Sequence, residues 1–210
     1  MTSVEKEIAQ SLLKIKAVKL SPNEPFTWAS GWNSPIYCDN RVTLSYPTIR
    51  KQIYQSFAQL INEKYPEAEL IAGVATGAIA HGVLVAEEMQ KPFIYVRSAP
   101  KGHGLGNQIE GQYSKGQKVV VIEDLISTGG SSLSAVEALK EAGVEVLGMV
   151  AIFTYGFATA EANFQKANLK VDTLSCYNAL IDAALESNYI QDKDLNDLKE
   201  WRTAPDKWRK

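Results

Sequence analysis

The sequence predicts an α/β protein in which a parallel β-sheet is flanked by helices and preceded by a small hood. Five short apolar segments have the length of buried strands, namely residues 70–74, 93–96, 119–122, 146–153 and 171–176. Helical patterns lie between most of them, notably at 79–89 and 132–142. Strands that are apolar on both faces and separated by helices indicate a parallel sheet covered on both sides. Ligands of such sheets bind at the carboxyl ends of the strands.

The elements ahead of the sheet have their own signals. Thr2 and Glu5 have capping-box spacing before apolar residues at helical spacing, which predicts a first helix. Residues 26–41 combine aromatic side chains with turn formers and are expected to be irregular. Pro47 suits the first turn of a second helix. Gly143 is expected to end the helix over 132–142 as a left-handed cap.

Length and composition favour one globular domain. The chain has 210 residues, of which 45% are hydrophobic, so we expect a single domain over 1–210 with a hood (about 1–45), a core (46–190) and a C-terminal helix and tail (191–210). The net charge of −2 supplies no overall basic field for binding nucleic acid or an anionic membrane. No nucleic-acid or membrane partner is therefore expected.

Targeting, membrane and metal signals are weak. Glu5 and Glu7 stand where a signal peptide would need a basic and then an apolar stretch, so a cytoplasmic location is expected. The longest uncharged run, 146–160, falls short of the roughly 20 apolar residues of a membrane span. Cys38 and Cys176 lie far apart without nearby ligating residues, so neither a disulfide nor a zinc site is predicted.

The run from 119 to 132 is typical of a site for a phosphorylated ribose. A buried strand over 119–122 delivers Glu123 and Asp124 to its carboxyl end. Ionised carboxylates accept hydrogen bonds from ribose hydroxyls or bind a divalent cation. The glycines and hydroxyls of 127–132 then precede a helix, and this combination makes an anion site. No lysine follows the glycines and the acids precede the turn, which excludes a Walker A loop and a Rossmann fingerprint.

This run resembles the signature of type I phosphoribosyltransferases. The resemblance implies the fold of that family and the ligand 5-phosphoribosyl 1-diphosphate. It would place the 5-phosphate on the backbone of 127–131 and the ribose hydroxyls on Glu123 and Asp124.

A glycine-rich segment at 98–107 follows Arg97 and carries Lys101 and His103. Its low apolar content is typical of a mobile lid, which would bring cations to a leaving diphosphate and exclude water. His81, the other histidine, lies in a helical pattern and is interpreted as a hydrogen-bonded helix residue rather than a catalyst.

Three motifs in order resemble orotate phosphoribosyltransferases. They are the lid with the GNQIEG that follows it at 106–111, the segment FTWASGWNSPIYCDNR at 26–41 and VATGAIAH at 74–81. The resemblance implies that Lys101, His103 and Asp124 are catalytic and that Ser127 contacts the base. The substrate-binding residues that it implies are Arg97, Lys101, His103, Glu123, Asp124, Leu125, Ile126, Ser127, Thr128, Gly129, Gly130 and Ser131.

The same resemblance implies a reaction and an assembly. Orotate N1 would attack the anomeric carbon as diphosphate leaves, giving orotidine 5′-monophosphate in pyrimidine biosynthesis. Mg²⁺ would be held mainly through the substrate, without a dedicated protein metal site. The chain would form a homodimer in which the loop at 98–112 reaches the neighbouring subunit's site.

The chain departs from the family pattern at three places. Ser98 and Ala99 stand where some members have lysines, and Ala29 stands where many have another. Residues 155–157 read Tyr-Gly-Phe where some members have an arginine for the carboxylate of orotate. Arg41 and backbone N–H groups are both candidates for that role.

Two other functions compete with orotate phosphoribosyl transfer. A purine-base phosphoribosyltransferase would use the same sugar site. A regulator that senses a phosphoribosyl ligand while binding nucleic acid is disfavoured by the acidic pI of about 5.8. A dinucleotide-dependent oxidoreductase lacks its glycine fingerprint.

Overall fold

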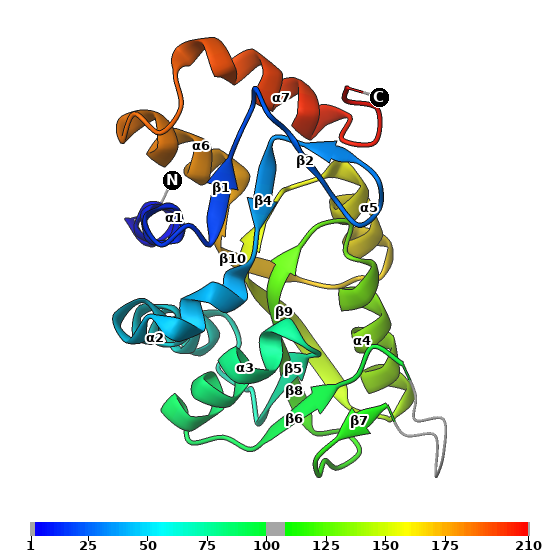
Figure 1. Cartoon of the computed structure of the whole chain (residues 1–210). Coiled ribbons are helices and arrows are strands. Elements are labelled where there is room, and N and C mark those ends of the chain that lie inside the picture. Colours follow the sequence, from blue (N-terminus) through cyan, green and yellow to red (C-terminus); the bar gives the residue numbers. More distant parts are fainter. Residues whose placement is uncertain (1–2, 100–107, 210) are drawn as a thin grey trace.

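The computed structural model describes residues 3–99 and 108–209. Its centre is a six-stranded sheet in the order β10-β9-β8-β5-β6-β7 (Figure 1). The strands are β5 (Leu70–Val74), β6 (Phe93–Val96), β7 (Ile109–Glu110), β8 (Lys118–Ile126), β9 (Glu145–Thr154) and β10 (Val171–Cys176). Strands β10 to β6 pair in parallel, and β7 pairs antiparallel with β6.

Helices cover both faces of this sheet, as the sequence predicts. Helices α2 (Pro47–Lys64) and α3 (Gly77–Glu88) lie on one side, and α4 (Gly130–Glu141) and α5 (Ala158–Lys166) lie on the other (Figure 1). Every residue of β5 is buried. Burial on both faces explains why the sequence of β5 is apolar throughout rather than alternating.

Most predicted elements have the expected positions, but β8 is longer than expected. The strand continues past the predicted end at Ile122 because Glu123 and Leu125 remain paired with β9, opposite Ala151 and Phe153. Leu125 and Ile126, which the resemblance implies as substrate-binding residues, are therefore strand residues. The side chain of Ile126 is 1% exposed and faces the core, so only its backbone is available for such a contact.

The hood contains short strands where residues 26–41 were expected to be irregular. Strand β1 (Val18–Leu20) pairs antiparallel with β4 (Ile36–Cys38), and β2 (Phe26–Thr27) pairs with β3 (Asn33–Ser34). The 3-10 helix η1 (Asn40–Ser45) follows. Strands of two or three residues are too short to produce a recognisable alternation of polar and apolar residues.

Helix α1 (Ser3–Lys14), predicted as part of the hood, packs on the core instead. It lies against α6 (Tyr177–Glu186) and β10. Ile8 and Leu12 are fully buried there, and Ser175 of β10 donates a hydrogen bond from Oγ to the carbonyl oxygen of Glu5 at 2.9 Å. The hood therefore consists of residues 18–45 rather than 1–45.

The C-terminal residues return to the hood. After η2 (Asp192–Asp194), helix α7 (Leu195–Thr203) runs above β2 and β4 (Figure 1). Trp201 and Trp208 are 0% and 4% exposed, so this end is packed into the protein. Among the described residues, no helix has both the length and the apolar character needed to cross a membrane.

Candidate active site

Glu123 and Asp124 are neighbours in β8, so their side chains leave opposite faces of the sheet. On the α4 side, Ser132 donates a hydrogen bond from Oγ to Oε2 of Glu123 at 2.7 Å. On the α3 side, a methyl group added to Gly77 would overlap the carboxylate of Asp124. The start of α3 can approach Asp124 because residue 77 has no side chain.

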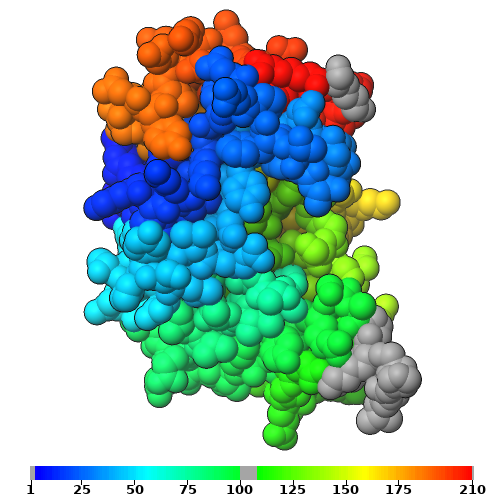
Figure 2. Space-filling view, viewed as in Figure 1, coloured from blue at the N-terminus to red at the C-terminus, as the bar shows by residue number. Residues whose placement is uncertain are grey.

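A polar cavity of about 310 Å³ lies at the carboxyl ends of β5 and β8, where sequence reasoning placed the ligand. The hood contributes one wall, and the turn between β5 and α3 contributes another. The lining residues are Cys38, Asp39, Arg41, Val74, Ala75, Thr76, Gly77, Glu123, Asp124, Leu125 and Ser131. In Figure 2 the hood, in blue, overhangs the yellow-green surface of the β8–α4 region.

The two acids of the polar cavity are poorly solvated. Burial raises the pKa of Glu123, and the negative charge of Asp124 raises it further. Burial likewise raises the pKa of Asp124 above its usual range. A cation or a pair of hydroxyl donors would favour the ionised forms, because it would replace the lost solvation. The pair is therefore suited to a ligand that supplies such groups.

Residues 127–129 connect β8 to the N-terminus of α4. Gly129 has a left-handed conformation, with φ of +80°, and a methyl group added there would approach the ring of Phe164 to 2.7 Å. Helix α4 begins at Gly130, which faces open space. Backbone N–H groups at the start of this 12-residue helix form a site for an anion.

An aromatic pocket of about 250 Å³ adjoins the polar cavity and shares Cys38 and Leu125 with it. Trp28 and Tyr155 form two of its walls, with ring centroids 5.2 Å apart. The lining residues are Thr27, Trp28, Ala29, Tyr37, Cys38, Leu125, Ser127 and Tyr155. No lysine, arginine or acid is among these described residues, and the aromatic walls suit a flat ring that stacks on them.

Comparison with known proteins identifies the family to which this chain belongs. The family model described as "Phosphoribosyl transferase domain" matches residues 44–185. The chain is 58% identical over 205 residues to the orotate phosphoribosyltransferase of Cytophaga hutchinsonii, covering 98% of each protein. It is 56% identical over 208 residues to that of Porphyromonas gingivalis, covering 99% of each. The chain belongs to the orotate phosphoribosyltransferase family.

The fold agrees with this membership. The crystal structure of orotate phosphoribosyltransferase from Aeropyrum pernix superposes with a TM-score of 0.75 at 25% identity, covering 87% of this chain and 99% of that one. The prediction of a type I phosphoribosyltransferase fold is therefore confirmed.

Several residues predicted from the resemblance lie around the two cavities of this family member. Glu123, Asp124, Leu125 and Ser131 line the polar cavity. Ser127 lines the aromatic pocket, next to Leu125. Thr128 and Gly129 belong to the connection between β8 and α4, and Gly130 is the first residue of α4.

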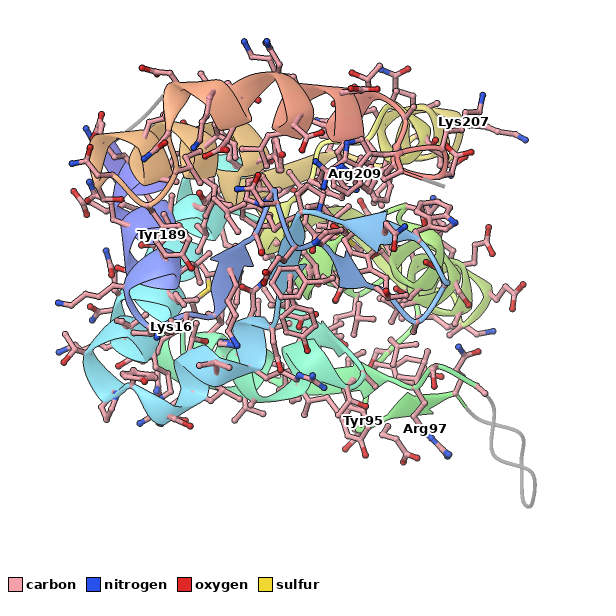
Figure 3. The ribbon with its side chains drawn as sticks, turned by 45° about the horizontal axis from the view of Figure 1, so that its top comes forward. Lys16, Tyr95, Arg97, Tyr189, Lys207 and Arg209 are labelled. Atoms are coloured by element: carbon pink, nitrogen blue, oxygen red, sulfur yellow. The ribbon has the colours of Figure 1, made fainter. Side chains whose placement is uncertain are left out.

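The catalytic loop expected for an orotate phosphoribosyltransferase is only partly described. Lys101 and His103 lie outside the described residues. Arg97 lines neither cavity and forms an ion pair with Glu110, with Nη1 3.7 Å from Oε1. It lies at the same edge of the molecule as Tyr95 of β6 (Figure 3).

Arg41 is a weaker candidate for the carboxylate of orotate than the sequence suggested. Its guanidinium makes two hydrogen bonds to the carboxylate of Asp39, at 2.7 and 3.0 Å. This contact lowers the pKa of Asp39, so the two charges are paired. Arg41 lines the polar cavity and not the aromatic pocket.

Sequence reasoning missed two residues that position this family's acid pair. Asn40 is fully buried and donates from Nδ2 to the carbonyl oxygen of Asp124 at 2.5 Å. Gly77 leaves room for the side chain of Asp124 and follows a cis peptide bond between Ala75 and Thr76. The sequence VATG at 74–77 belongs to a motif that resembles the family, but nothing in it indicated a contact with Asp124.

His81 has a different environment from the one expected. Its Nε2 lies 3.3 Å from the hydroxyl of Thr43, but its buried Nδ1 has no hydrogen-bond partner among the described residues. Burial lowers the pKa of His81 to about 4, so the imidazole is neutral near pH 7. The ring therefore serves the packing of α3 against η1 rather than proton transfer.

Proposed function

We propose that this chain transfers the 5-phosphoribosyl group from 5-phosphoribosyl 1-diphosphate to orotate. The products are orotidine 5′-monophosphate and diphosphate, in pyrimidine biosynthesis. The observation that carries the proposal is the pairing of two adjacent cavities. One holds two carboxylates beside a helix N-terminus and the other is aromatic and uncharged.

The ribosyl diphosphate occupies the polar cavity in this proposal. The 5-phosphate binds the backbone N–H groups of 127–131, at the positive end of α4. The ribose hydroxyls donate to Asp124 and Glu123, which lets both acids ionise despite burial. The raised pKa values of these acids support the assignment, because a ligand of this kind supplies the missing donors.

The residues present also fit Mg²⁺ bound mainly through the substrate. Mg²⁺ prefers oxygen ligands and usually keeps several water molecules. It therefore needs only one or two carboxylates from the protein, together with phosphate oxygens of the substrate. Among the described residues, no group of three acids, histidines or cysteines could hold a metal ion, whereas Glu123 and Asp124 offer carboxylate oxygens at the cavity. When bound, Mg²⁺ neutralises part of the diphosphate charge.

The base occupies the aromatic pocket, against the rings of Trp28 and Tyr155, with Ser127 as a polar contact. This position lies beside the ribose, so orotate N1 is held next to the anomeric carbon. Backbone N–H groups of the lining segments are favoured over Arg41 for the carboxylate of orotate, because Arg41 is paired with Asp39. The protein contributes positioning and charge stabilisation rather than a covalent intermediate.

The remaining parts of the proposal rest on the family resemblance. Lys101 and His103 stabilise the departing diphosphate together with Arg97. The protein is a homodimer in which the loop at 98–112 completes the partner's site. Length and composition, rather than the resemblance, favour a single domain, and the N-terminal residues favour the cytoplasm.

The deciding experiment presents several bases to the enzyme separately. Protein, Mg²⁺ and 5-phosphoribosyl 1-diphosphate are mixed with orotate, uracil, hypoxanthine or adenine, and the absorbance of the base is followed. Product is expected with orotate and with none of the other three bases. Turnover of hypoxanthine or adenine without turnover of orotate would instead support the purine-base alternative.

A further inference from the structure

The turn after β9 is held by a residue of the C-terminal helix. Tyr155 lines the aromatic pocket, and Gly156 follows it. Arg202 of α7 donates from Nε to the carbonyl oxygen of Tyr155 and from Nη2 to that of Gly156, both at 3.2 Å. Its Nη1 donates to Oδ1 of Asn178 in α6 at 2.8 Å. One guanidinium therefore fastens this turn to two helices.

Trp201 packs behind the two aromatic walls of the pocket. Its ring is fully buried and meets Trp28 edge-on, with ring centroids 5.7 Å apart. It meets Tyr155 in the same way at 5.6 Å. Because Trp28 and Tyr155 also contact each other, the three rings form one unit. The position of α7 therefore sets the position of both walls.

The residues after α7 fasten it to the hood, which carries Trp28. Arg209 donates from Nη1 to the carbonyl oxygen of Pro22 at 2.7 Å, and its own carbonyl oxygen accepts from Nδ2 of Asn33 at 2.6 Å. Its Nη2 also donates to Asp197 of α7 at 2.6 Å. Figure 3 shows Arg209 turned inward at the hood, whereas Lys207 points away from the molecule.

We propose that α7 is a positioning element for base recognition, with Arg202 and Trp201 as its positioning residues. Neither residue lines the aromatic pocket or the polar cavity, so both act through Tyr155 and Trp28. This inference rests on the proposed function in one respect, namely that the base occupies the aromatic pocket. The polar cavity contains no residue of α7, and the Arg202 contacts act on the turn at Tyr155, so their loss should affect the base far more than the ribosyl diphosphate.

The kinetic test compares Arg202→Ala with Arg202→Lys. Arg202→Ala loses both carbonyl contacts, so the KM for orotate should rise roughly tenfold or more. The Kd for 5-phosphoribosyl 1-diphosphate with Mg²⁺ and the circular dichroism spectrum should not change. A lysine offers one point donor in place of a fork, so Arg202→Lys should raise the KM less.

Lys207→Ala is the control variant. Lys207 is exposed and lies outside α7, so this substitution should leave the KM for orotate at the wild-type value. Trp201→Phe keeps an edge-on ring and should raise the KM for orotate less than Trp201→Leu. Equal losses of affinity for both substrates, or an unchanged KM for orotate in folded Arg202→Ala, would overturn the proposal.

Alkylation of Cys38 examines the same pocket without any base. Cys38 lines the aromatic pocket, and its thiol donates to Oδ1 of Asn40 at 3.4 Å. In a Cys176→Ser background, Arg202→Ala should raise the rate of reaction with N-ethylmaleimide several-fold, and Lys207→Ala should not. An unchanged rate in Arg202→Ala would count against the proposal. If the wild type forms no product from orotate, the proposed function fails, and the alkylation rates still decide the positioning role.

Discussion

The amide of Asn40 donates a hydrogen bond to the carbonyl oxygen of Asp124, which joins the hood to the strand that carries the acid pair. Asn40 is fully buried, and its own carbonyl oxygen accepts from the hydroxyl of Thr43. A change in the hood can therefore reach the ribose site without contacting the ligand.

Replacement of Asn40 by alanine should weaken both the fold and the ribose site. A buried carbonyl left without a donor costs about 1–3 kcal/mol, so the free energy of unfolding should fall by that order. The affinity for 5-phosphoribosyl 1-diphosphate should fall as well, measured by calorimetric titration. Asn33→Ala, another asparagine of the hood, serves as the control, because the side chain of Asn33 donates to Arg209 rather than to β8 and its loss should leave this affinity intact.

Neutralising the acid pair should weaken binding of the sugar and the metal together. Asp124→Asn with Glu123→Gln removes both negative charges and replaces one acceptor oxygen of each acid by an NH2 donor, and a loss of roughly a hundredfold in affinity is expected. Titration of 5-phosphoribosyl 1-diphosphate with and without Mg²⁺ measures it. The exposed acid Glu141 provides the matched control, Glu141→Gln. Normal affinity in the double variant would remove the pair from the ribose site.

Gly77→Ala should displace the carboxylate of Asp124, because the added methyl group overlaps it. Binding of the ribosyl diphosphate should weaken, and the free energy of unfolding should fall by about 1–3 kcal/mol. A double-mutant cycle with Asp124→Ala tests the cause. Once the carboxylate is removed, Gly77→Ala should cost much less stability; equal costs in both backgrounds would place the clash elsewhere.

Protonation of His81 should destabilise the protein at acidic pH. Its pKa is about 4 in the folded state against an ordinary value of 6.5, so between these values the unfolded chain binds a proton that the folded protein does not. Stability from this group is complete above pH 6.5 and is lost as the pH falls towards 4, on the order of 3 kcal/mol. Urea unfolding across this range measures it. His81→Gln, which cannot titrate, should show a shallower dependence.

Lys101→Ala should lower kcat by roughly a hundredfold or more while leaving the fold intact. The lost cation acts on the departing diphosphate, whose charge develops in the transition state. Steady-state kinetics with both substrates measures the effect, with the exposed Lys166→Ala as the control. An unchanged kcat would exclude Lys101 from the mechanism.

The parts that could be predicted from sequence depend on neighbours along the chain. Strands β5 and β6 have their predicted bounds because each is a short apolar run, and β10, which is more polar, also has its predicted bounds. Gly143 lies two residues after the end of α4 and has a φ of +81°, as predicted for a left-handed cap. The proposed sugar site is equally local in sequence, since the acids and the glycine turn follow one another from β8 into α4.

The parts that could not be predicted depend on contacts between distant segments. Asn40 and Asp124 are hydrogen-bonded although they are 84 residues apart in the sequence. Arg202 and Tyr155 are hydrogen-bonded at a separation of 47 residues. No periodicity or short motif encodes such pairs, because they arise from the packing of finished elements. The place of α1 on the core was missed for the same reason, since an amphipathic helix shows that it packs but not on what.

Because a chain is synthesised from its N-terminus, α7 can pack against the hood only after the residues of the polar cavity have been made. Every described residue that lines the polar cavity lies at or before Ser131, so a growing chain contains them well before it contains α7. The side chains behind the aromatic pocket, Trp201 and Arg202, are made later. A chain cut short before them would still carry every described lining residue of the polar cavity, without the support for its aromatic walls.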